Sequence, residues 1–200
     1  MNFTITIARE YGSGGRFIAS KVAEILNIPF YDKNLLLKEA QDKGINPNDI
    51  MNLDEEEKEF YLPTMNNTYG MDLEMSQRSY MATLKMIQLI ASSQSSVIVG
   101  RCADYILSDD EDAVLKVFIY APMESKVKRA IKYYGLSKNK EETRKIIEKK
   151  DKKRKKYYEF ITEKNWGDPV EYDLLVNSDM GIEEAAYAIA AAAKAKFNIK

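Results

Sequence analysis

Two hydrophobic periodicities divide this chain into segments. Residues 3–8 form a short apolar run in which Ile5 and Ile7 alternate with threonines, and residues 97–99 and 114–120 form further apolar runs. Such runs predict strands, and an uninterrupted run such as 97–99 is typical of a strand buried on both faces of a parallel sheet. Residues 28–31 and 172–176 predict two more short strands.

Between these runs, apolar residues recur every three or four positions, which is the spacing of a helix with one buried face. This spacing predicts helices over residues 15–26, 33–42, 76–94, 123–133, 139–161 and 183–197. Residues 43–75 are polar and contain two prolines, so we expect an irregular or mobile lobe there. Five strands that alternate with helices predict an α/β fold, a three-layer, doubly wound, five-stranded parallel sheet.

The segment that says most about function joins the first predicted strand to the first predicted helix. It reads Arg9-Glu-Tyr-Gly-Ser-Gly-Gly-Arg16. A tight turn before a helix aims several backbone N–H groups at one point, and the helix dipole adds positive charge there, so the segment suits a phosphate. The usual phosphate-loop pattern places a lysine where this chain has Gly15, and a serine or threonine where it has Arg16. A glycine-rich turn without a ligand is the alternative.

Composition narrows the chemistry. The chain has no histidine, which excludes histidine-based triads, histidine general bases and histidine-ligated zinc. The net charge of −1 gives no general bias toward nucleic acid. The single cysteine, Cys102, excludes an intramolecular disulfide framework and fits a reducing cytosol. With no signal peptide and no apolar run near 18 residues, we expect a cytoplasmic protein without a membrane partner.

A second candidate site follows the predicted strand at 97–99. Arg101 leaves this buried strand at the edge where ligands bind in such sheets, and a guanidinium there can hold a phosphate through two hydrogen bonds. Asp104 lies three residues later, at an expected helix start. It is a candidate for a magnesium contact or for a carboxylate near the attacking group, or it is simply an acid favoured by the helix dipole.

A third candidate site is the basic helix over 139–161. Residues 145–156 contain eight Lys and Arg residues against Glu148 and Asp151. Arg144, Glu148 and Asp151 share a face, and Asp151 and Arg154 are neighbours one helical turn apart. Arginines on a mobile helix are suited to close over a transferring phosphoryl group. We interpret the lysines as a solvated face, and we do not expect nucleic-acid binding because the rest of the chain is acidic.

Two further residues have open interpretations. Asp32 follows the second predicted strand, where it either accepts a hydrogen bond from a ribose or base, or caps the next helix. Arg78 opens the long helix over 76–94 and either contacts a substrate phosphate or is a surface residue.

Together these segments resemble the cytidylate kinase-like proteins, a branch of the P-loop nucleoside monophosphate kinases. The resemblance rests on motifs that span nearly the whole chain in the order of the family. They are Ile7-Ala-Arg-Glu-Tyr-Gly-Ser-Gly-Gly-Arg16, Pro29-Phe-Tyr-Asp-Lys33, Val99-Gly-Arg-Cys-Ala-Asp-Tyr-Ile-Leu107, Asp151 with Arg154, and Tyr172-Asp-Leu-Leu-Val-Asn-Ser178.

The resemblance implies a single domain over 1–200, a monophosphate-binding helical insertion over 33–94 and a lid over 135–160. Cytidylate kinases move the terminal phosphoryl group of ATP to CMP or dCMP with Mg²⁺, so it also implies ATP and Mg²⁺ as cofactors and small-molecule nucleotides as partners. In these terms Gly12, Ser13, Gly14 and Gly15 match the phosphate loop, and Asp32, Arg101 and the pair Gln77 and Arg78 match acceptor-site residues. Asp151 and Arg154 match the Asp-x-x-Arg sequence of the lid.

The chain departs from cytidylate kinases at three places: Gly15-Arg16 replaces the Lys-Ser/Thr pair, Cys102 replaces an aspartate, and Ile147-Glu148 replaces an Arg-Asp pair. We expect Arg16 to take over part of the role of the missing lysine, with Arg9 as the alternative. Ser13 or Asp104 would supply a magnesium oxygen. The leading hypothesis is a nucleoside monophosphate kinase, and the alternative is a catalytically silent module that senses a nucleotide or another anion. Base preference and oligomeric state stay open.

Overall fold

A five-stranded parallel sheet forms the centre of the molecule. The structure, a computed structural model, describes residues 2–46 and 70–199, with side chains from residue 78 onward in the second range. The strands lie in the order β2-β3-β1-β4-β5, and every neighbouring pair is parallel. Their bounds are β1 Thr4–Arg9, β2 Phe30–Tyr31, β3 Ser96–Val99, β4 Val114–Tyr120 and β5 Leu174–Asn177. The prediction of five parallel strands is confirmed.

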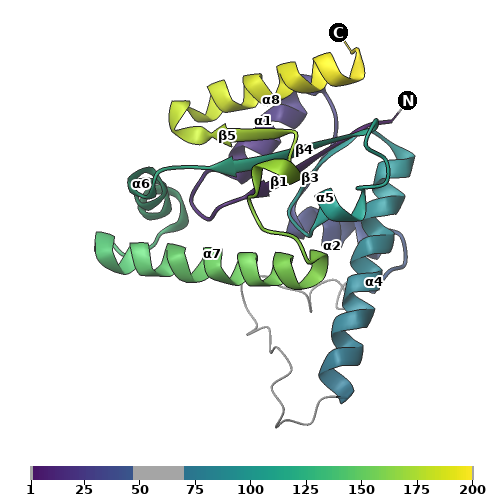
Figure 1. Cartoon of the computed structure of the whole chain (residues 1–200), viewed down its shortest axis with the longest axis horizontal. Helices are drawn as coiled ribbons and strands as arrows, with labels where there is room; N and C mark the ends of the chain where they lie inside the picture. The colour runs from purple at the N-terminus through teal and green to yellow at the C-terminus, as the bar shows by residue number, and fades with distance from the viewer. Residues whose placement is uncertain (1, 47–69, 200) are drawn as a thin grey trace.

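Helices cover both faces of the sheet, as Figure 1 shows. On one face lie α1 (Gly15–Leu26) and α8 (Ile182–Phe197). On the other face lie α2 (Lys33–Asp42), α4 (Gly70–Ser93) and the single turn α5 (Ala103–Ile106). Two further helices, α6 (Met123–Tyr134) and α7 (Lys140–Thr162), follow β4 and pack against each other. The three-layer, doubly wound prediction is therefore confirmed.

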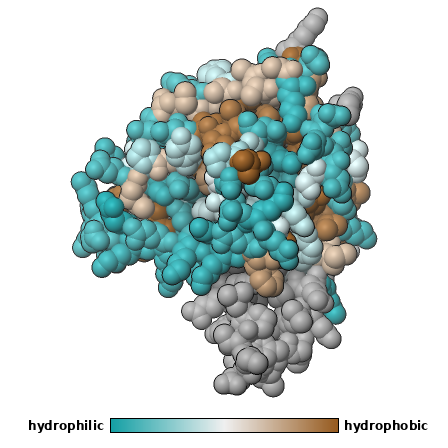
Figure 2. All heavy atoms as spheres, in the orientation of Figure 1, coloured by the Kyte–Doolittle hydropathy of each residue, from teal (hydrophilic) through white to brown (hydrophobic). Residues whose placement is uncertain are grey.

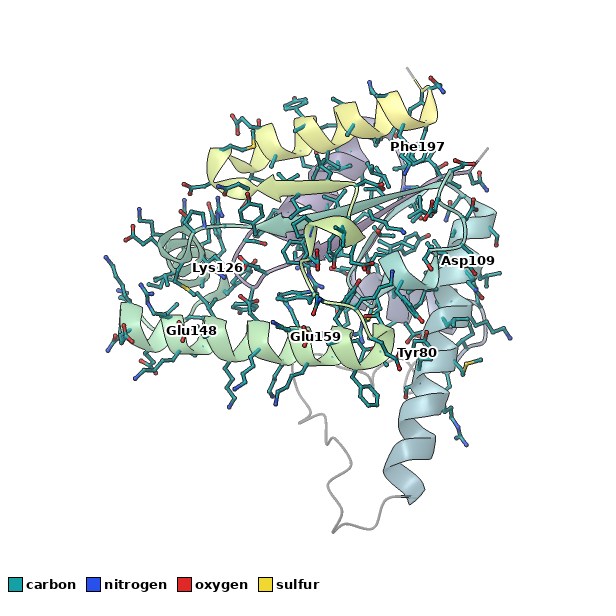
Figure 3. The ribbon with its side chains drawn as sticks, in the orientation of Figure 1. Tyr80, Asp109, Lys126, Glu148, Glu159 and Phe197 are labelled. Atoms are coloured by element: carbon teal, nitrogen blue, oxygen red, sulfur yellow. The ribbon has the colours of Figure 1, made fainter. Side chains whose placement is uncertain are left out.

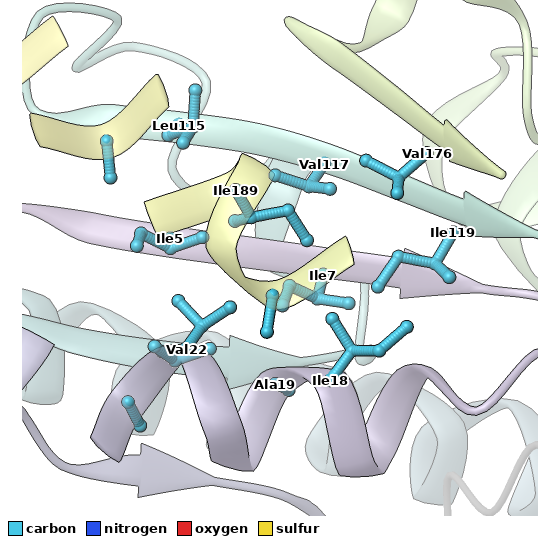
Figure 4. Close-up of a cluster of buried hydrophobic side chains, with 14 of the residues drawn as sticks. Ile5, Ile7, Ile18, Ala19, Val22, Leu115, Val117, Ile119, Val176 and Ile189 are labelled. Carbon is cyan, nitrogen blue, oxygen red and sulfur yellow. The ribbon is translucent and has the colours of Figure 1, made fainter. Parts of the chain in front are cut away.

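The largest core lies between the sheet and the pair α1 and α8. Ile5 and Ile7 of β1 contribute alternate side chains to it, and Ile18 and Val22 of α1 and Ile189 of α8 cover them (Figure 4). All five side chains are almost completely inaccessible to solvent. This core fixes α1, and with it the turn that precedes α1, relative to the sheet.

Helix α4 is longer than the sequence pattern predicted. It begins at Gly70 rather than at residue 76, so the expectation of an irregular lobe is wrong for residues 70–75. Residues 71–75 read Met-Asp-Leu-Glu-Met and are mostly good helix formers, a local preference that the polar composition of the longer segment obscured. The rest of the predicted lobe at 47–69 lies outside the described residues.

None of the helices in the described parts of the chain combines the length and the apolar character that crossing a membrane requires.

Ile189 allows a direct test of the main core. We expect Ile189→Ala to lower the free energy of unfolding by about 2–5 kcal/mol and Ile189→Val by about 0.5–1.5 kcal/mol, since each leaves a cavity under α8. Urea titration measures both. Tyr187→Ala, on the exposed side of the same helix, is the control and should change stability by less than about 0.5 kcal/mol. Equal effects at the two positions would contradict this packing.

Candidate functional site

The β1–α1 turn and the β3–α5 turn lie next to each other at the carboxyl edge of the sheet. This follows from the strand order, because β1 pairs with β3 and Ile7 is in register with Val99. The backbone N–H of Gly100 continues the ladder by donating to the carbonyl of Ile7 at 3.0 Å. In open parallel sheets, ligands bind in the crevice outside this edge.

The β1–α1 turn has the geometry of an anion cradle. Gly12 and Gly14 both have φ of 81°, a left-handed conformation that only glycine adopts without strain. Gly14 is the residue before α1, and α1 has neither a capping side chain nor an acid in its first turn. In contrast, Asp32 caps α2 and Asn139 caps α7. The first N–H groups of α1 thus lack a side-chain partner, and a phosphate would complement them and the helix dipole.

Hydrogen bonds of Ser13 fix the β1–α1 turn to the rest of the molecule. Ser13 is completely buried, and its hydroxyl donates to the carbonyl of Glu10 at 2.8 Å. The carbonyl of Ser13 accepts from Ser178 Oγ at 2.6 Å and from Arg129 Nη1 at 3.3 Å. The hydroxyl of Ser13, a predicted magnesium ligand, therefore faces the main chain of its own turn.

Three arginines line one pocket at this edge: Arg9 from the end of β1, Arg101 from the β3–α5 turn and Arg154 from α7. The guanidinium of Arg9 lies directly over Gly100, where an added Cβ would collide with its Nη1. Arg154 Nη1 donates to the carbonyl of Arg9 at 3.4 Å. Arg101, which directly follows the buried strand β3, is itself almost fully buried. Aromatic rings of Tyr157, Tyr158 and Trp166 close the pocket.

The backbone of the β3–α5 turn is unusual. Gly100, Arg101 and Cys102 have φ of 73°, 62° and 52°, so that three successive residues are left-handed and two of them carry side chains. The two residues with side chains, Arg101 and Cys102, each cost roughly 1–2 kcal/mol relative to a right-handed conformation. Strain of this kind concentrates at functional sites, where the surrounding structure holds it in place.

Asp104 lies in the first turn of α5 and lines the same pocket. Its carboxylate accepts a hydrogen bond from the hydroxyl of Tyr158 at 2.8 Å. Burial raises the pKa of Asp104, against the opposing effect of this hydrogen bond. The pKa of Tyr158 is raised by its own burial and by the neighbouring carboxylate, so this phenol stays protonated.

Asp151 and Arg154 both face the body of the molecule from α7. Asp151 Oδ1 accepts from the backbone N–H of Tyr11 at 2.6 Å, and its Oδ2 lies 3.0 Å from Lys126 Nζ. Arg144 and Glu148, which we grouped with Asp151, are exposed instead. The solvent side of α7 is hydrophilic (Figure 2) and carries exposed lysines, in agreement with the interpretation of a solvated face.

Asp32 and Arg16 form an ion pair away from the pocket. Arg16 Nε donates to Asp32 Oδ2 at 2.6 Å, while Asp32 Oδ1 caps α2 by accepting from Leu35 N at 3.0 Å. The Arg16 side chain is 60% exposed. Arg78 is an exposed residue of α4. None of these three lines the pocket of the arginines, so the structure brings Arg101, Arg154 and Asp104 together but not Asp32, Arg16 and Arg78 with them.

Lys126 and Arg129 of α6 are site residues that the sequence analysis missed. Lys126 is buried against Gly12, and Arg129 holds the carbonyls of Ser13 and Ser178. A signal existed, because Lys126 and Ala130 are one helical turn apart on the apolar face of α6. A charge on a buried stripe needs a partner, and such residues are candidates for a site.

The described residues contain no group of three or more Cys, Asp or Glu side chains arranged to hold a metal ion. Ser13 and Asp104, the two predicted oxygen donors, both make hydrogen bonds within the protein. Mg²⁺ commonly binds through substrate phosphates, waters and one or two carboxylates, and a site of that kind needs no preformed protein cage.

Comparison with known proteins identifies related chains. A sequence profile of the cytidylate kinase-like family matches residues 4–180. A crystal structure of an uncharacterized protein from Eubacterium ventriosum is 29% identical, with a TM-score of 0.69 over 96% of this chain and 98% of that chain. A search of curated proteins found no match.

Two enzyme structures share the fold at lower identity. Shikimate kinase from Bacteroides thetaiotaomicron is 14% identical, with a TM-score of 0.56 over 96% of this chain and 98% of that chain. A gluconokinase from Sinorhizobium meliloti is 13% identical, with a TM-score of 0.52 over 96% and 93%. At these identities the likeness concerns the fold alone, which is that of the P-loop kinases.

The close approach of Gly12 to α6 predicts a specific loss on substitution. An alanine Cβ at Gly12 would lie 2.9 Å from the carbonyl oxygen of Lys126. Gly44 has a similar φ of 71° but open space around it, so it is a matched control. We expect Gly44→Ala to cost roughly 1–2 kcal/mol for the left-handed backbone alone. Gly12→Ala should cost about 1–3 kcal/mol more because of the overlap. Equal losses in urea titrations would mean that the turn does not rest on α6.

The buried carboxyl of Asp104 predicts a dependence of stability on pH. Folding raises the pKa of Asp104. Its contribution to the free energy of unfolding is therefore fully present below the pKa that it has in the unfolded chain, and is lost as the pH rises through the pKa that it has in the folded protein. Asp104→Asn removes this titration, so the variant should lose less stability than the unmodified protein between mildly acidic and neutral pH. Asp109→Asn, at an exposed site, is the control. Parallel curves for Asp104→Asn and the unmodified protein would contradict the raised pKa.

Proposed function

We propose that this chain, which belongs to the cytidylate kinase-like family, transfers the terminal phosphoryl group of ATP to a nucleoside monophosphate of the CMP or dCMP type. The observation that carries the proposal is the position of the uncapped N-terminus of α1 beside a pocket of three arginines. The N-terminus of α1 suits the phosphates of a donor, and the pocket of arginines suits the phosphate of an acceptor. The reduced, buried thiol of Cys102 is consistent with a cytoplasmic location.

Each group then has a role. The N–H groups from Gly12 to Arg16 would bind the donor triphosphate, and Arg101 would bind the acceptor phosphate. Arg154, on the inner face of α7, would lie between them, where charge is shared in the transition state. Residues 135–160 would act as the lid that excludes water. Acceptor contacts by Asp32 and Arg78 stay predictions, since Asp32 pairs with Arg16 and Arg78 is exposed.

The missing lysine needs a substitute, because charge stabilisation is commonly the largest catalytic contribution. Two contacts support Arg9 over our first expectation, Arg16. Arg9 lies over Gly100, and its Cβ and Cγ cover Gly15, the residue in the position of the lysine. Arg16 is largely exposed and is already neutralised by Asp32. We therefore assign the cation of the phosphate loop to Arg9.

Mg²⁺ would enter with the nucleotide and lower the charge of its phosphates. The oxygens of the phosphates and water would be its main ligands, as is common for Mg²⁺ in nucleotide sites. The buried Ser13 hydroxyl and the Asp104 carboxylate make other contacts, so a direct bond from either to the ion requires a local rearrangement.

A silent nucleotide- or anion-binding module is the second candidate. Gly15 and Arg16 replace the lysine and the serine or threonine of the usual phosphate loop, so the loop lacks two groups that ordinarily contact the phosphates and Mg²⁺. This candidate predicts binding of nucleotides without transfer.

A panel assay tests the two candidates. The purified protein is incubated with ATP, Mg²⁺ and each of a set of nucleoside monophosphates, while ADP release and thermal unfolding are followed. The proposal predicts ADP release that depends on the acceptor and is largest for CMP or dCMP. Thermal stabilisation by nucleotides without turnover would favour the silent module. If nucleotides cause neither ADP release nor thermal stabilisation, a nucleotide site is excluded.

The role of Arg9 predicts a difference between two alanine variants. Charge-assisted hydrogen bonds are worth about 1.5–3 kcal/mol, so Arg9→Ala should weaken ATP binding by about this amount in isothermal titration. Arg16→Ala should have a much smaller effect, because its guanidinium is already paired with Asp32. Arg101→Ala should spare ATP and weaken binding of CMP. A loss confined to Arg16→Ala would return the role to Arg16.

A further inference from the structure

Lys126 is a buried cation placed between the phosphate loop and α7. It is 5% exposed, and its Nζ lies 3.1 Å from Glu10 Oε2 and 3.0 Å from Asp151 Oδ2. Figure 3 labels it on α6, beside α7. Lysines are almost never fully buried unless they are paired. The two carboxylates belong to different elements, so this lysine joins the end of β1 to α7.

Both carboxylates make further contacts that extend this link. Asp151 Oδ1 accepts from the backbone N–H of Tyr11 at 2.6 Å, and Glu10 Oε2 accepts from the N–H of Ala121 at 3.2 Å. Gly12 rests against the backbone and Cβ of Lys126. Residues 10–12 of the loop thus contact both α6 and α7, and the ammonium group of Lys126 with its two carboxylate partners lies at the centre of these contacts.

The link reaches an arginine of the pocket. Asp151 and Arg154 are one helical turn apart on α7, so the position of Asp151 sets the position of Arg154. Arg154 Nη1 donates to the carbonyl of Arg9, and its guanidinium carbon lies 5.4 Å from the centre of the Tyr11 ring. A shift of Asp151 away from the loop would therefore also move Arg154 away from it.

We infer that Lys126 is a positioning residue, which holds the phosphate loop and α7 together so that Arg154 lies at the reacting phosphates. This role rests on the proposed phosphoryl transfer. Without the ammonium group, the carboxyl groups of Glu10 and Asp151 would lose the cation that joins them, and the link between the two elements would break. The lysine acts through Asp151 and Arg154 and does not itself need to touch the substrate.

The test compares Lys126→Met with two controls. Lys126→Met keeps most of the volume but removes the charge, and Lys128→Met makes the same change at an exposed position of the same helix. Lys126→Arg restores a cation. The kcat and KM for ATP with CMP are measured together with hydrogen exchange of residues 10–15 and of α7 in the full chain. Hydrogen exchange needs no turnover, so it separates a failure of this inference from a failure of the proposed function.

The inference predicts that Lys126→Met lowers kcat on the order of tenfold to 100-fold with a small change in KM. The reason is that a misplaced Arg154 would stabilise the transition state less while leaving substrate binding nearly unchanged. Exchange should accelerate in the loop and α7, and Lys126→Arg should recover part of both losses. Lys128→Met should match the unmodified protein. In the double variant Lys126→Met/Arg154→Ala, the two losses in kcat should not add, because Lys126 acts through Arg154.

Asp151→Asn keeps the test decisive if Lys126→Met fails to fold. It breaks the same link from α7 and leaves Lys126 paired with Glu10. It should also accelerate exchange in the loop and α7 and lower kcat. Unchanged exchange and kcat in a folded Asp151→Asn or Lys126→Met variant would overturn the inference, as would a loss of stability with an unchanged kcat.

Discussion

The pairing of β1 with β3 is the constraint on which the candidate site depends. It places the β1–α1 turn and the β3–α5 turn side by side, so that Arg9 lies over Gly100 and both arginines, Arg9 and Arg101, reach one pocket. Glycines give the β1–α1 turn its left-handed positions without strain, whereas Arg101 and Cys102 are strained residues in the β3–α5 turn, which the surrounding structure holds in place. The sheet therefore determines where the two arginines meet, and the turns determine how closely they approach each other.

Several carboxylates at this edge of the sheet have partners within the protein. Asp151 and Glu10 share Lys126, and Asp32 pairs with Arg16. Burial raises the pKa of Asp104, and the hydrogen bond from Tyr158 opposes that shift. In the proposed function, the three arginines of the pocket supply the positive charge that a loop without its lysine lacks.

The sequence predicted the parts of the site that depend on local pattern. Arg101 became a candidate because it follows an uninterrupted apolar run, and the glycine-rich turn became a candidate because its glycines lie between a strand and a helix. Lys126 and Arg129 were missed because their partners lie far away in the sequence, and only their position on an apolar stripe marks them. The choice between Arg9 and Arg16 depended on side-chain directions, which the pairing of Arg16 with Asp32 sets and which no periodicity encodes.

The central claim is that arginines around the lysine-free turn bind the triphosphate. A crystal structure of the protein with ATP and Mg²⁺ tests it most directly. The account predicts phosphates on the N–H groups of Gly12 to Arg16, with the guanidinium groups of Arg9 and Arg154 in contact with them. A triphosphate bound elsewhere on the molecule, or one at this turn that neither arginine contacts, would contradict it.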